Sequence, residues 1–251
     1  MMRTADLVGR LIQCLRGLWA FFLPVLYPDS CVVCGAVLPF CLDKEDKAAA
    51  CEACAEILQS SAESMSDKDI FGAMEGRAFL CCFAAYPYED AARDMILRYK
   101  SGGHTAAARD IAVLLTRRFP KETLLALTPS LDLLIPVPSH KSRRKTRGFS
   151  PTELVTEYLS AHYGLPYNAA ALIITKPTER QRGLNAADRQ RNVENAYAVQ
   201  DAAAIAGKTI LLFDDVLTTG ATADACAKVL LAAGAKAVYV LVIASTQLKM
   251  P

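Results

Sequence analysis

The chain has 251 residues, of which 53% are hydrophobic and 22% are charged. This composition supports a buried core and excludes a wholly disordered chain, and nine cysteines are too few for a small disulfide-rich scaffold. The formal net charge of +2 combines −6 over residues 1–90 (7 Lys/Arg, 13 Asp/Glu) with +8 over residues 91–251 (21 Lys/Arg, 13 Asp/Glu). Anionic ligands are therefore expected in the second part of the chain.

The N-terminal segment predicts an amphipathic helix within residues 1–30. Apolar residues recur there at three- and four-residue spacing, with arginines between them. The longest apolar run, Leu18–Leu23, is too short to cross a bilayer, and Pro24 and Pro28 follow it without a signal-peptide cleavage site. We expect a helix packed on its own domain, with a membrane-surface or partner-binding helix as the less favoured alternative. The protein is then not an integral membrane protein, and it is expected to be cytoplasmic with reduced thiols.

Two C-x2-C pairs, Cys31/Cys34 and Cys51/Cys54, are separated by sixteen residues. Two such turns that face each other supply four thiolates at tetrahedral angles, a ligand set that suits Zn²⁺. Four thiolates leave no open position for a substrate, so the predicted zinc is structural. Residues 31–58 are interpreted as a zinc ribbon whose stability depends on the metal.

The other cysteines and the segment that follows carry less information. Cys41 lies between the two pairs and stays open as a substitute ligand. A single C-x2-C pair is also typical of redox proteins, but two pairs at this separation favour a metal. Residues 59–77 are polar without clear periodicity and are interpreted as a linker. The remaining cysteines sit among apolar residues and are interpreted as core residues: Cys14, Cys81, Cys82 and Cys226.

From residue 78 onward, strand and helix patterns alternate. Strands are predicted at residues 78–85, 131–138, 170–175, 209–213 and 238–244. Helices are predicted at residues 86–98, 106–119, 152–163 and 222–233. This alternation predicts an α/β domain with a parallel sheet, flanking helices and right-handed crossovers. Ligands of such sheets bind outside the carboxyl ends of the strands.

The stretch after the predicted strand 209–213 indicates phosphate binding. Asp214 and Asp215 end the strand, and a loop at the expected start of a helix follows: Thr218, Thr219, Gly220, Ala221 and Thr222. Helix N-terminal N–H groups and threonine hydroxyls bind a phosphate dianion, whereas the acidic pair suits ribose hydroxyls of the same ligand or Mg²⁺. A capped helix explains only one such hydroxyl or carboxylate. Neither a Walker P-loop nor G-x-G-x-x-G after a strand is present.

This stretch resembles the motif by which type I phosphoribosyltransferases bind 5-phosphoribosyl 1-pyrophosphate (PRPP). The whole chain resembles the ComF family of competence-associated proteins, which join a zinc ribbon to such a domain. Beyond the cysteine pairs and the PRPP motif, the resemblance includes Arg98-Tyr99-Lys100, Pro136-Val-Pro138, Arg147-Gly-Phe149 and the stretch from Gln181 to Asn192. It covers nearly the whole chain and implies that residues 78–251 form a type I phosphoribosyltransferase-like domain linked to DNA uptake.

The resemblance also implies roles for individual residues. Asp214 and Asp215 would contact the ribose hydroxyls of PRPP, and the loop from Thr218 to Thr222 would hold its 5′-phosphate. The turn formed by Ser139, His140 and Lys141 corresponds to the pyrophosphate loop, and residues 176–195 correspond to a loop that closes over the site. The sequence departs from its relatives at Ser150, where they usually have Asn. Its cysteine set also supports one zinc, although the family is often called a double zinc ribbon.

Two basic stretches accompany these motifs. The first, residues 140–147, has five Lys/Arg and no acid, and the second lies between residues 178 and 192. Charge runs usually form solvated faces, but both stretches follow predicted strands on the side of the phosphate loop, so we expect them to bind pyrophosphate. The proposed ligands are Arg143, Arg147, Arg182, Arg189 and Arg191. The same cations suit single-stranded DNA, although only Phe149 and Tyr197 lie nearby as stacking platforms.

The sequence therefore predicts a PRPP-binding, phosphoribosyltransferase-like protein associated with DNA uptake. The expected reaction displaces pyrophosphate from PRPP, with Mg²⁺, by an unidentified nitrogenous acceptor, and Asp214 or Asp215 is available as a general base. One alternative is a non-catalytic component of the uptake machinery that binds single-stranded DNA or nucleotides. Another is a scaffold that recruits a DNA-uptake helicase or other competence proteins.

Overall fold

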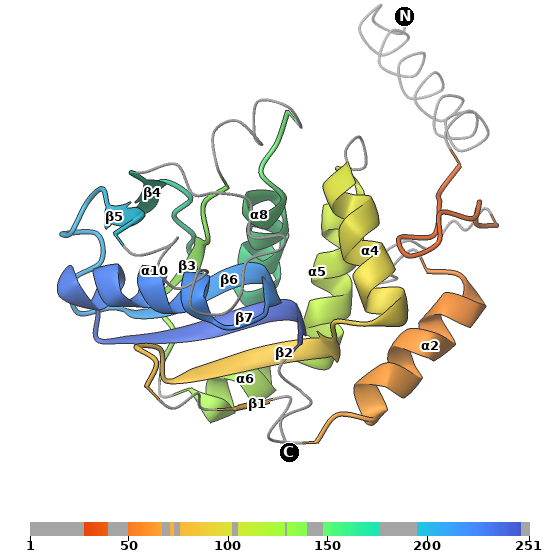
Figure 1. Ribbon diagram of the computed structural model, residues 1–251, viewed down its shortest axis with the longest axis horizontal. Coiled ribbons are helices and arrows are strands. Elements are labelled where there is room, and N and C mark those ends of the chain that lie inside the picture. The colour runs from red at the N-terminus through yellow and green to blue at the C-terminus, as the bar shows by residue number, and fades with distance from the viewer. Residues whose placement is uncertain are drawn as a thin grey trace, which may run out of the picture.

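A computed structural model describes residues 28–39, 50–66, 71–72, 76–101, 105–128, 130–139, 148–175 and 195–246 (Figure 1). The strands are β1 (Phe71–Gly72), β2 (Cys81–Pro87), β3 (Leu133–Pro136), β4 (Leu172–Ile174), β5 (Tyr197–Val199), β6 (Thr209–Leu217) and β7 (Ala237–Ser245). The helices are α2 (Glu52–Glu63), α4 (Asp90–Ser101), α5 (Ala107–Arg118), α6 (Lys121–Leu127), α8 (Pro151–Tyr163) and α10 (Ala221–Ala232).

The main sheet has the strand order β1-β2-β7-β6-β3. Strands β2, β7, β6 and β3 pair parallel with one another. The two-residue strand β1 pairs antiparallel with β2 at the edge of the sheet. The register places Phe213 of β6 beside Pro136 of β3 and Leu241 of β7. The carboxyl ends of these strands therefore meet at one edge, where ligands of open α/β sheets bind. The predicted α/β class with a parallel sheet is confirmed.

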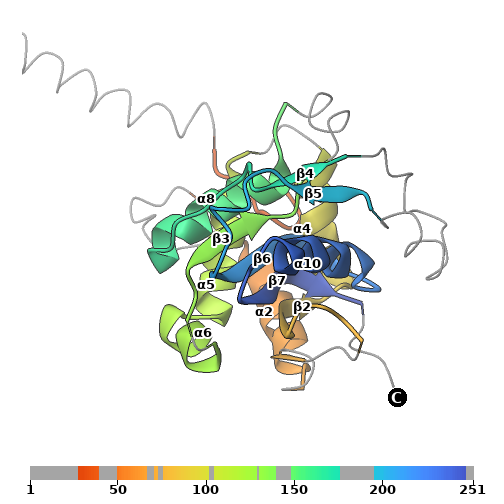
Figure 2. The same cartoon turned by 90° about the vertical axis from the view of Figure 1, so that its left-hand side faces the viewer.

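Both faces of the sheet are buried, so its strands are apolar almost throughout. Phe213 and Leu241 face a core shared with α2, α4, α5, α6 and α8. Leu212 and Val240, one residue earlier on each strand, face a second core that α10 and the β4–β5 pair cover. Figures 1 and 2 show the resulting layers, with α10 on one side of the sheet and α5 and α8 on the other.

The segment predicted as a strand at residues 170–175 is not part of the parallel sheet. It forms β4, which pairs antiparallel with β5 in a separate two-stranded sheet, with Leu172 opposite Val199. Only the first of the three β4 residues is buried, because a short edge segment covers α10 rather than entering the sheet core. Helix α6 was not predicted because its apolar residues form one continuous run, 124–127, without helical spacing; Leu124 alone of them is buried.

Helix α2 extends into the segment interpreted as a linker. Its buried residues, Cys54, Leu58 and Ala62, are spaced by four and form one stripe on the helix. The polar residues between them made this spacing hard to recognise in the sequence. Arg118 of α5 donates a hydrogen bond from Nη2 to the carbonyl of Ala62 (3.0 Å). The cysteine-bearing segment therefore shares the core beneath α4 and α5.

Of the predicted N-terminal helix, only residues 28–30 belong to the described part, and they are not helical. Ser30 instead forms a β-bridge with Val37. In the segments that the structure describes, no helix is both long and apolar enough to span a membrane.

Candidate functional site

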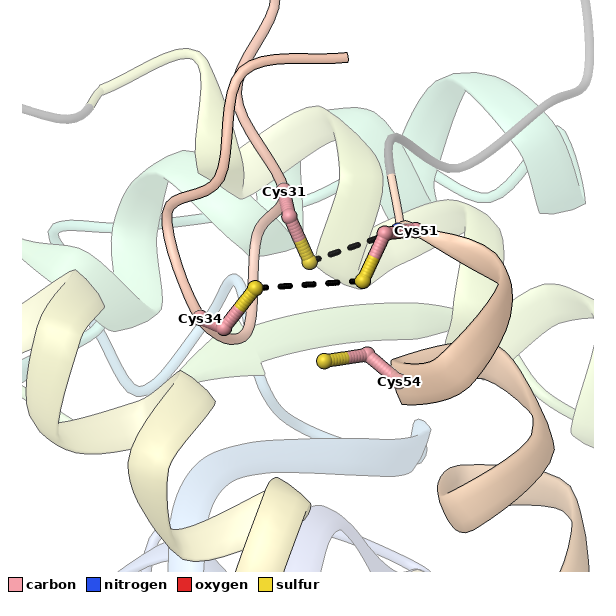
Figure 3. A group of neighbouring side chains, drawn as sticks. All are labelled: Cys31, Cys34, Cys51 and Cys54. Carbon is pink, nitrogen blue, oxygen red and sulfur yellow. Dashed lines mark hydrogen bonds between the residues drawn. The ribbon is translucent and has the colours of Figure 1, made fainter.

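The four predicted zinc ligands lie together (Figure 3), with Cys31 and Cys54 buried, Cys51 half-buried and Cys34 exposed. Cys31 and Cys34 come from a tight hairpin, which the hydrogen bonds Gly35 N–Cys31 O (2.9 Å) and Cys31 N–Ala36 O (2.7 Å) close. Cys51 precedes α2 and Cys54 lies in its first turn. One hairpin and one helix start thus present two thiols each.

The geometry of these thiols fits a zinc ion. All four sulfur atoms lie within 4.8 Å of one another, and the Cys34 and Cys51 sulfurs are 3.8 Å apart. Four zinc–sulfur bonds of about 2.3 Å in a tetrahedron require sulfur separations of about 3.8 Å. Figure 3 shows Cys54 pointing toward the other three from the helix. The cluster is consistent with a tetrahedral Zn²⁺, as predicted; Cys41 lies outside the described residues.

Backbone groups prepare the buried thiol of Cys31 for metal binding. Burial opposes its ionisation, but hydrogen bonds from the backbone N–H groups of Cys51, Cys34 and Val33 outweigh burial and lower the pKa of Cys31 to about 6. Burial raises the pKa of Cys54, and its hydrogen bonds to the neighbouring thiols act in the same direction. Cys81, Cys82 and Cys226 are instead buried in the sheet and α10 cores, as predicted.

The cysteine hairpin lies close to α4 at Gly35. Gly35 has a φ of +79°, and a Cβ at this position would overlap the guanidinium group of Arg98. Arg98 lies in the last turn of α4, so the hairpin and α4 approach each other at this point. The first residue of the motif Arg98-Tyr99-Lys100 therefore lies beside the thiol cluster.

The acidic pair lies at the carboxyl end of β6, the edge that the fold predicts for a ligand. Asp214 and Asp215 are half-buried, and the N–H of Asp215 donates to Asp214 Oδ1 (2.8 Å). Lys100 of α4 reaches across to Asp215, with 2.5 Å between Nζ and Oδ2. Sequence reasoning quoted the motif that holds Lys100 but did not place it at this site.

The environment of Asp214 makes it a weak acid. Burial and the adjacent Asp215 carboxylate raise the pKa of Asp214 to about 7, although the Lys100 ammonium and the Asp215 N–H act in the opposite direction. A carboxylic acid with this pKa can exchange a proton near neutral pH, as a general base requires.

The predicted phosphate loop follows directly and leads into α10. Gly220 precedes the helix with a φ of +74°, a left-handed conformation that suits glycine. Thr218, Thr219 and Thr222 are half-buried, and the N–H of Ala221 donates to the Thr219 hydroxyl (3.4 Å). Hydroxyls and the first N–H groups of α10 are thus gathered beside the acidic pair, an arrangement that can bind a phosphate group.

Arg77 and Asp224, which sequence reasoning missed, support the threonine loop through contacts with its backbone and with the start of α10. Arg77, before β2, donates from Nη2 to the carbonyl of Thr219 (2.5 Å) and lies 3.6 Å from the buried carboxylate of Asp224. Asp224 also accepts from the N–H of Ala78 (2.7 Å) and pairs with Lys228 (2.9 Å). Burial opposes ionisation, but Lys228, the Ala78 N–H and Arg77 together lower the pKa of Asp224.

Ser139 ends the described part of the predicted pyrophosphate loop. Val137, two residues earlier, donates its N–H to the carbonyl of Phe213 (2.8 Å), which places Ser139 beside the acidic end of β6. Ser150 donates to the Ser139 hydroxyl (3.3 Å), and Thr152 donates to the carbonyl of Val137 (2.8 Å). Ser150, where the sequence departs from its relatives, therefore lies beside Ser139.

The remaining predicted ligands lie outside the described residues, and their positions stay predictions. They are His140, Lys141, Arg143, Arg147, Arg182, Arg189 and Arg191. The described part of the site thus holds the acidic pair, the threonine loop and Ser139, together with Lys100, Arg77 and Asp224.

Comparison with known proteins supports the family resemblance. No protein-family model matches the chain. It is 34% identical over 109 residues to DNA utilization protein YhgH of Escherichia coli (strain K12), which covers 43% of this chain and 47% of that protein. It is 32% identical over 110 residues to Competence protein F of Haemophilus influenzae, with 43% and 48% covered. Competence protein ComFC of Bacillus subtilis (strain 168) is 27% identical over 158 residues, with 60% and 58% covered.

The matched regions span about half the length of these curated relatives. The predicted resemblance to the ComF family is confirmed as a sequence similarity. Solved structures with a distant likeness include the adenine phosphoribosyltransferase of Leishmania donovani (14% identity, TM-score 0.36, covering 62% of this chain and 70% of that one). Another is the glutamine PRPP amidotransferase of B. subtilis complexed with ADP and GMP (19% identity, TM-score 0.35, covering 63% and 29%).

Proposed function

We propose that this chain binds PRPP at the carboxyl edge of its parallel sheet and transfers the phosphoribosyl group to a nitrogenous acceptor. The observation that carries the proposal is the direct succession of two carboxylates and a threonine loop at the start of α10. Asp214 and Asp215 match the hydroxyls of a ribose. The loop from Thr218 to Thr222 directly follows the two carboxylates. Its hydroxyls and N–H groups are therefore suited to bind a phosphate attached to that ribose.

The rest of the ligand has a place at the same edge. Ser139 begins the loop proposed to hold the pyrophosphate, and it lies next to β6 because β3 and β6 are paired. The arginines proposed to neutralise the pyrophosphate follow Ser139 and precede β5 in the chain. Mg²⁺ bound with PRPP would supply a Lewis acid for the leaving pyrophosphate.

The proposed transfer requires the protein to position PRPP and the acceptor, and it does not require a nucleophilic side chain. The acceptor nitrogen forms a bond to the anomeric carbon while the bond from that carbon to the pyrophosphate oxygen breaks. Pyrophosphate leaves with the bonding electrons, and the acceptor nitrogen gives up one proton. Asp214 is the proposed recipient of this proton, since its raised pKa matches a base working near neutral pH. The remaining protein groups orient the ribose and the phosphates.

The proposal is tested by calorimetric titration of PRPP with Mg²⁺ into the zinc-loaded chain. We expect saturable binding that Asp215→Asn weakens by about tenfold or more, because a charge-assisted hydrogen bond is lost. Asp132→Asn is the matched control. Asp132 accepts a hydrogen bond from the Thr209 N–H at the opposite end of β6, so this change should leave PRPP affinity unaltered. Absence of binding to the folded wild type would refute the proposal.

The structural zinc is a separate part of the proposal. The four-thiol geometry supports one Zn²⁺ per chain at Cys31, Cys34, Cys51 and Cys54. We expect metal analysis of the purified protein to give a zinc stoichiometry near one. Retention of zinc after Cys51→Ser would refute the assignment of these four ligands.

A non-catalytic role in DNA handling is the second candidate, favoured by the names of the relatives, DNA utilization protein and competence protein. The basic residues at 140–147 would then bind the backbone of single-stranded DNA, and competence proteins would be partners. This role predicts salt-dependent binding of an oligonucleotide that survives Asp215→Asn and is lost when Arg143 and Arg147 are replaced together. PRPP binding without DNA binding would exclude it.

A further inference from the structure

Among the residues that the structure describes, Lys100 is the cation paired with the acidic end of β6. Its Nζ lies 2.5 Å from Asp215 Oδ2, and the two side chains are only 27% and 20% exposed. The lysine comes from α4, whereas the aspartate ends β6, so the ion pair joins two separate elements. A partly buried ion pair of this kind is screened less by salt than a solvent-exposed one.

The last turn of α4 holds Lys100 in place from both sides. Tyr99 is buried, donates its hydroxyl hydrogen to the carbonyl of Pro151 (2.9 Å) and packs against Phe149 with 5.9 Å between ring centroids. The guanidinium of Arg98 lies close to Gly35 of the cysteine hairpin. The backbone around Lys100 is thus anchored, while the ammonium remains at the end of a flexible stem that can turn.

The ion pair conflicts with the role of Asp215 in ligand binding. Two adjacent half-buried carboxylates require a nearby positive charge, and Lys100 supplies it in the free protein. The ammonium occupies the Oδ2 atom that a ribose hydroxyl or a divalent cation would otherwise contact. The Lys100 ammonium repels a divalent cation at that atom, so cation binding favours movement of Lys100, and the anionic groups of the same ligand offer the ammonium a new partner.

We propose that Lys100 is an exchangeable cation of this site, paired with Asp215 when the site is empty and with a phosphate oxygen of the ligand when it is filled. The identity of the ligand as PRPP rests on the proposed function, but the exchange itself concerns only the acidic pair, a divalent cation and a phosphate anion. Lys100 then competes with a divalent cation for Asp215 and contributes to binding of the phosphate anion.

Removing the Lys100 charge should therefore change the affinities for Mn²⁺ and for inorganic pyrophosphate in opposite directions. Lys100→Met keeps most of the side-chain stem and removes the charge. Without the competing ammonium, Mn²⁺ alone should bind the acidic pair about tenfold more tightly. Inorganic pyrophosphate without metal should bind about tenfold more weakly, because one charge-assisted contact is lost. Lys100→Arg should keep both affinities near wild type. A lysine with only a structural role would not shift the two probes in opposite directions.

The experiment uses the zinc-loaded full chain, with Mn²⁺ binding followed by electron paramagnetic resonance and pyrophosphate binding by calorimetry. Lys236→Met is the control, because Lys236 precedes β7 at the opposite edge of the sheet. Asp215→Asn shows which Mn²⁺ signal belongs to the site, and Lys100→Gln repeats the test if Lys100→Met does not fold. Tighter Mn²⁺ with weaker pyrophosphate supports the exchange. Unchanged or weaker Mn²⁺ binding in the Lys100 variants, or no site-specific Mn²⁺ signal, overturns it.

A PRPP titration of the wild type separates this proposal from the proposed function. If wild-type protein does not bind PRPP but Lys100→Met still shifts the two probes in opposite directions, the phosphoribosyltransferase proposal fails and the exchange stands. If PRPP binds and Lys100→Met leaves Mn²⁺ affinity unchanged, the exchange fails alone.

Discussion

The thiol cluster and the acidic phosphate loop are both built at the start of a helix, but they are held together in different ways. The cluster takes its four ligands from one hairpin and the first turn of α2, and its sulfurs lie within 4.8 Å of one another. The acidic loop is oriented by Arg77 and Lys100, which come from other parts of the fold. The four thiols need the metal to hold them together, whereas the orientation of the acidic loop depends on contacts with the rest of the fold.

The largest expected effect tests the dependence of the cluster on its metal. Cys51→Ser should abolish zinc binding and lower the free energy of unfolding by about 4 kcal/mol or more, since loss of a structural metal is among the most destabilising changes. Zinc analysis and urea unfolding measure the two effects. Cys226→Ala, which removes a buried thiol of the α10 core, should lose stability and keep its zinc. Zinc loss in both variants would contradict the comparison.

The next effect tests the dependence of the phosphate loop on the fold. Asp224→Asn should lower the free energy of unfolding by about 3 kcal/mol, because it leaves Lys228 and Arg77 without their buried anionic partner. Asp201→Asn is the control, since Asp201 is exposed and accepts backbone N–H groups of its own turn. Urea unfolding at pH 7 compares the two. Equal losses would mean that the buried carboxylate adds nothing to the loop.

A third change tests the contact between the cysteine hairpin and α4. Gly35→Ala should cost about 2 kcal/mol, because the Arg98 guanidinium has to move aside in addition to the cost of a left-handed alanine. Gly207→Ala has a φ of +73° with nothing within 4 Å of the added Cβ, so it carries the backbone cost alone, about 1 kcal/mol. Combining Gly35→Ala with Arg98→Ala should recover part of the difference. Equal thermal midpoints for the two glycine variants would show that Arg98 moves aside freely.

The smallest effect concerns the pH dependence that the acidic pair imposes on stability. The pKa of Asp214 is raised on folding to about 7 from an ordinary 3.8, so the folded state loses stability as pH rises through this interval. Asp214→Asn should therefore stabilise the protein by about 1 kcal/mol at pH 8, a value reduced for partial exposure. The gain should shrink toward pH 5. Unfolding of both proteins across this range measures it, and a gain that grows as pH falls would contradict the assigned direction.

Sequence reasoning located the thiol cluster and the acidic pair with its threonine loop, because the residues of each are close together in the chain. Cysteine spacing was sufficient for the thiol cluster, because tetrahedral coordination by two short turns restricts the number of residues between ligands. Asp214, Asp215 and the threonine loop were recognisable because strand, acids, loop and helix follow one another directly. The two cores were predictable from buried apolar strands, and the alternation of strands and helices predicted the parallel sheet.

The parts that were missed depend on contacts between distant segments. Arg77 reaches Thr219 over 142 residues of chain, and no periodicity marks such a pair. Asp224 looked like an ordinary polar residue of a helix, although it is buried under Arg77 and Lys228. Strand β4 had the apolar composition of a core strand, but its pairing with β5 is a tertiary choice that composition does not encode.

The last turn of α4 has a consequence for how this chain tolerates insertions. Arg98, Tyr99 and Lys100 are consecutive, and each contacts a different partner: the cysteine hairpin, the start of α8 and the acidic pair. Successive residues of an α-helix point about 100° apart, so these three side chains leave the helix in three different directions. One residue added or removed earlier in α4 would rotate the turn by that angle and misdirect all three at once. The helical phase of α4 is therefore as closely constrained as the identities of the residues it carries.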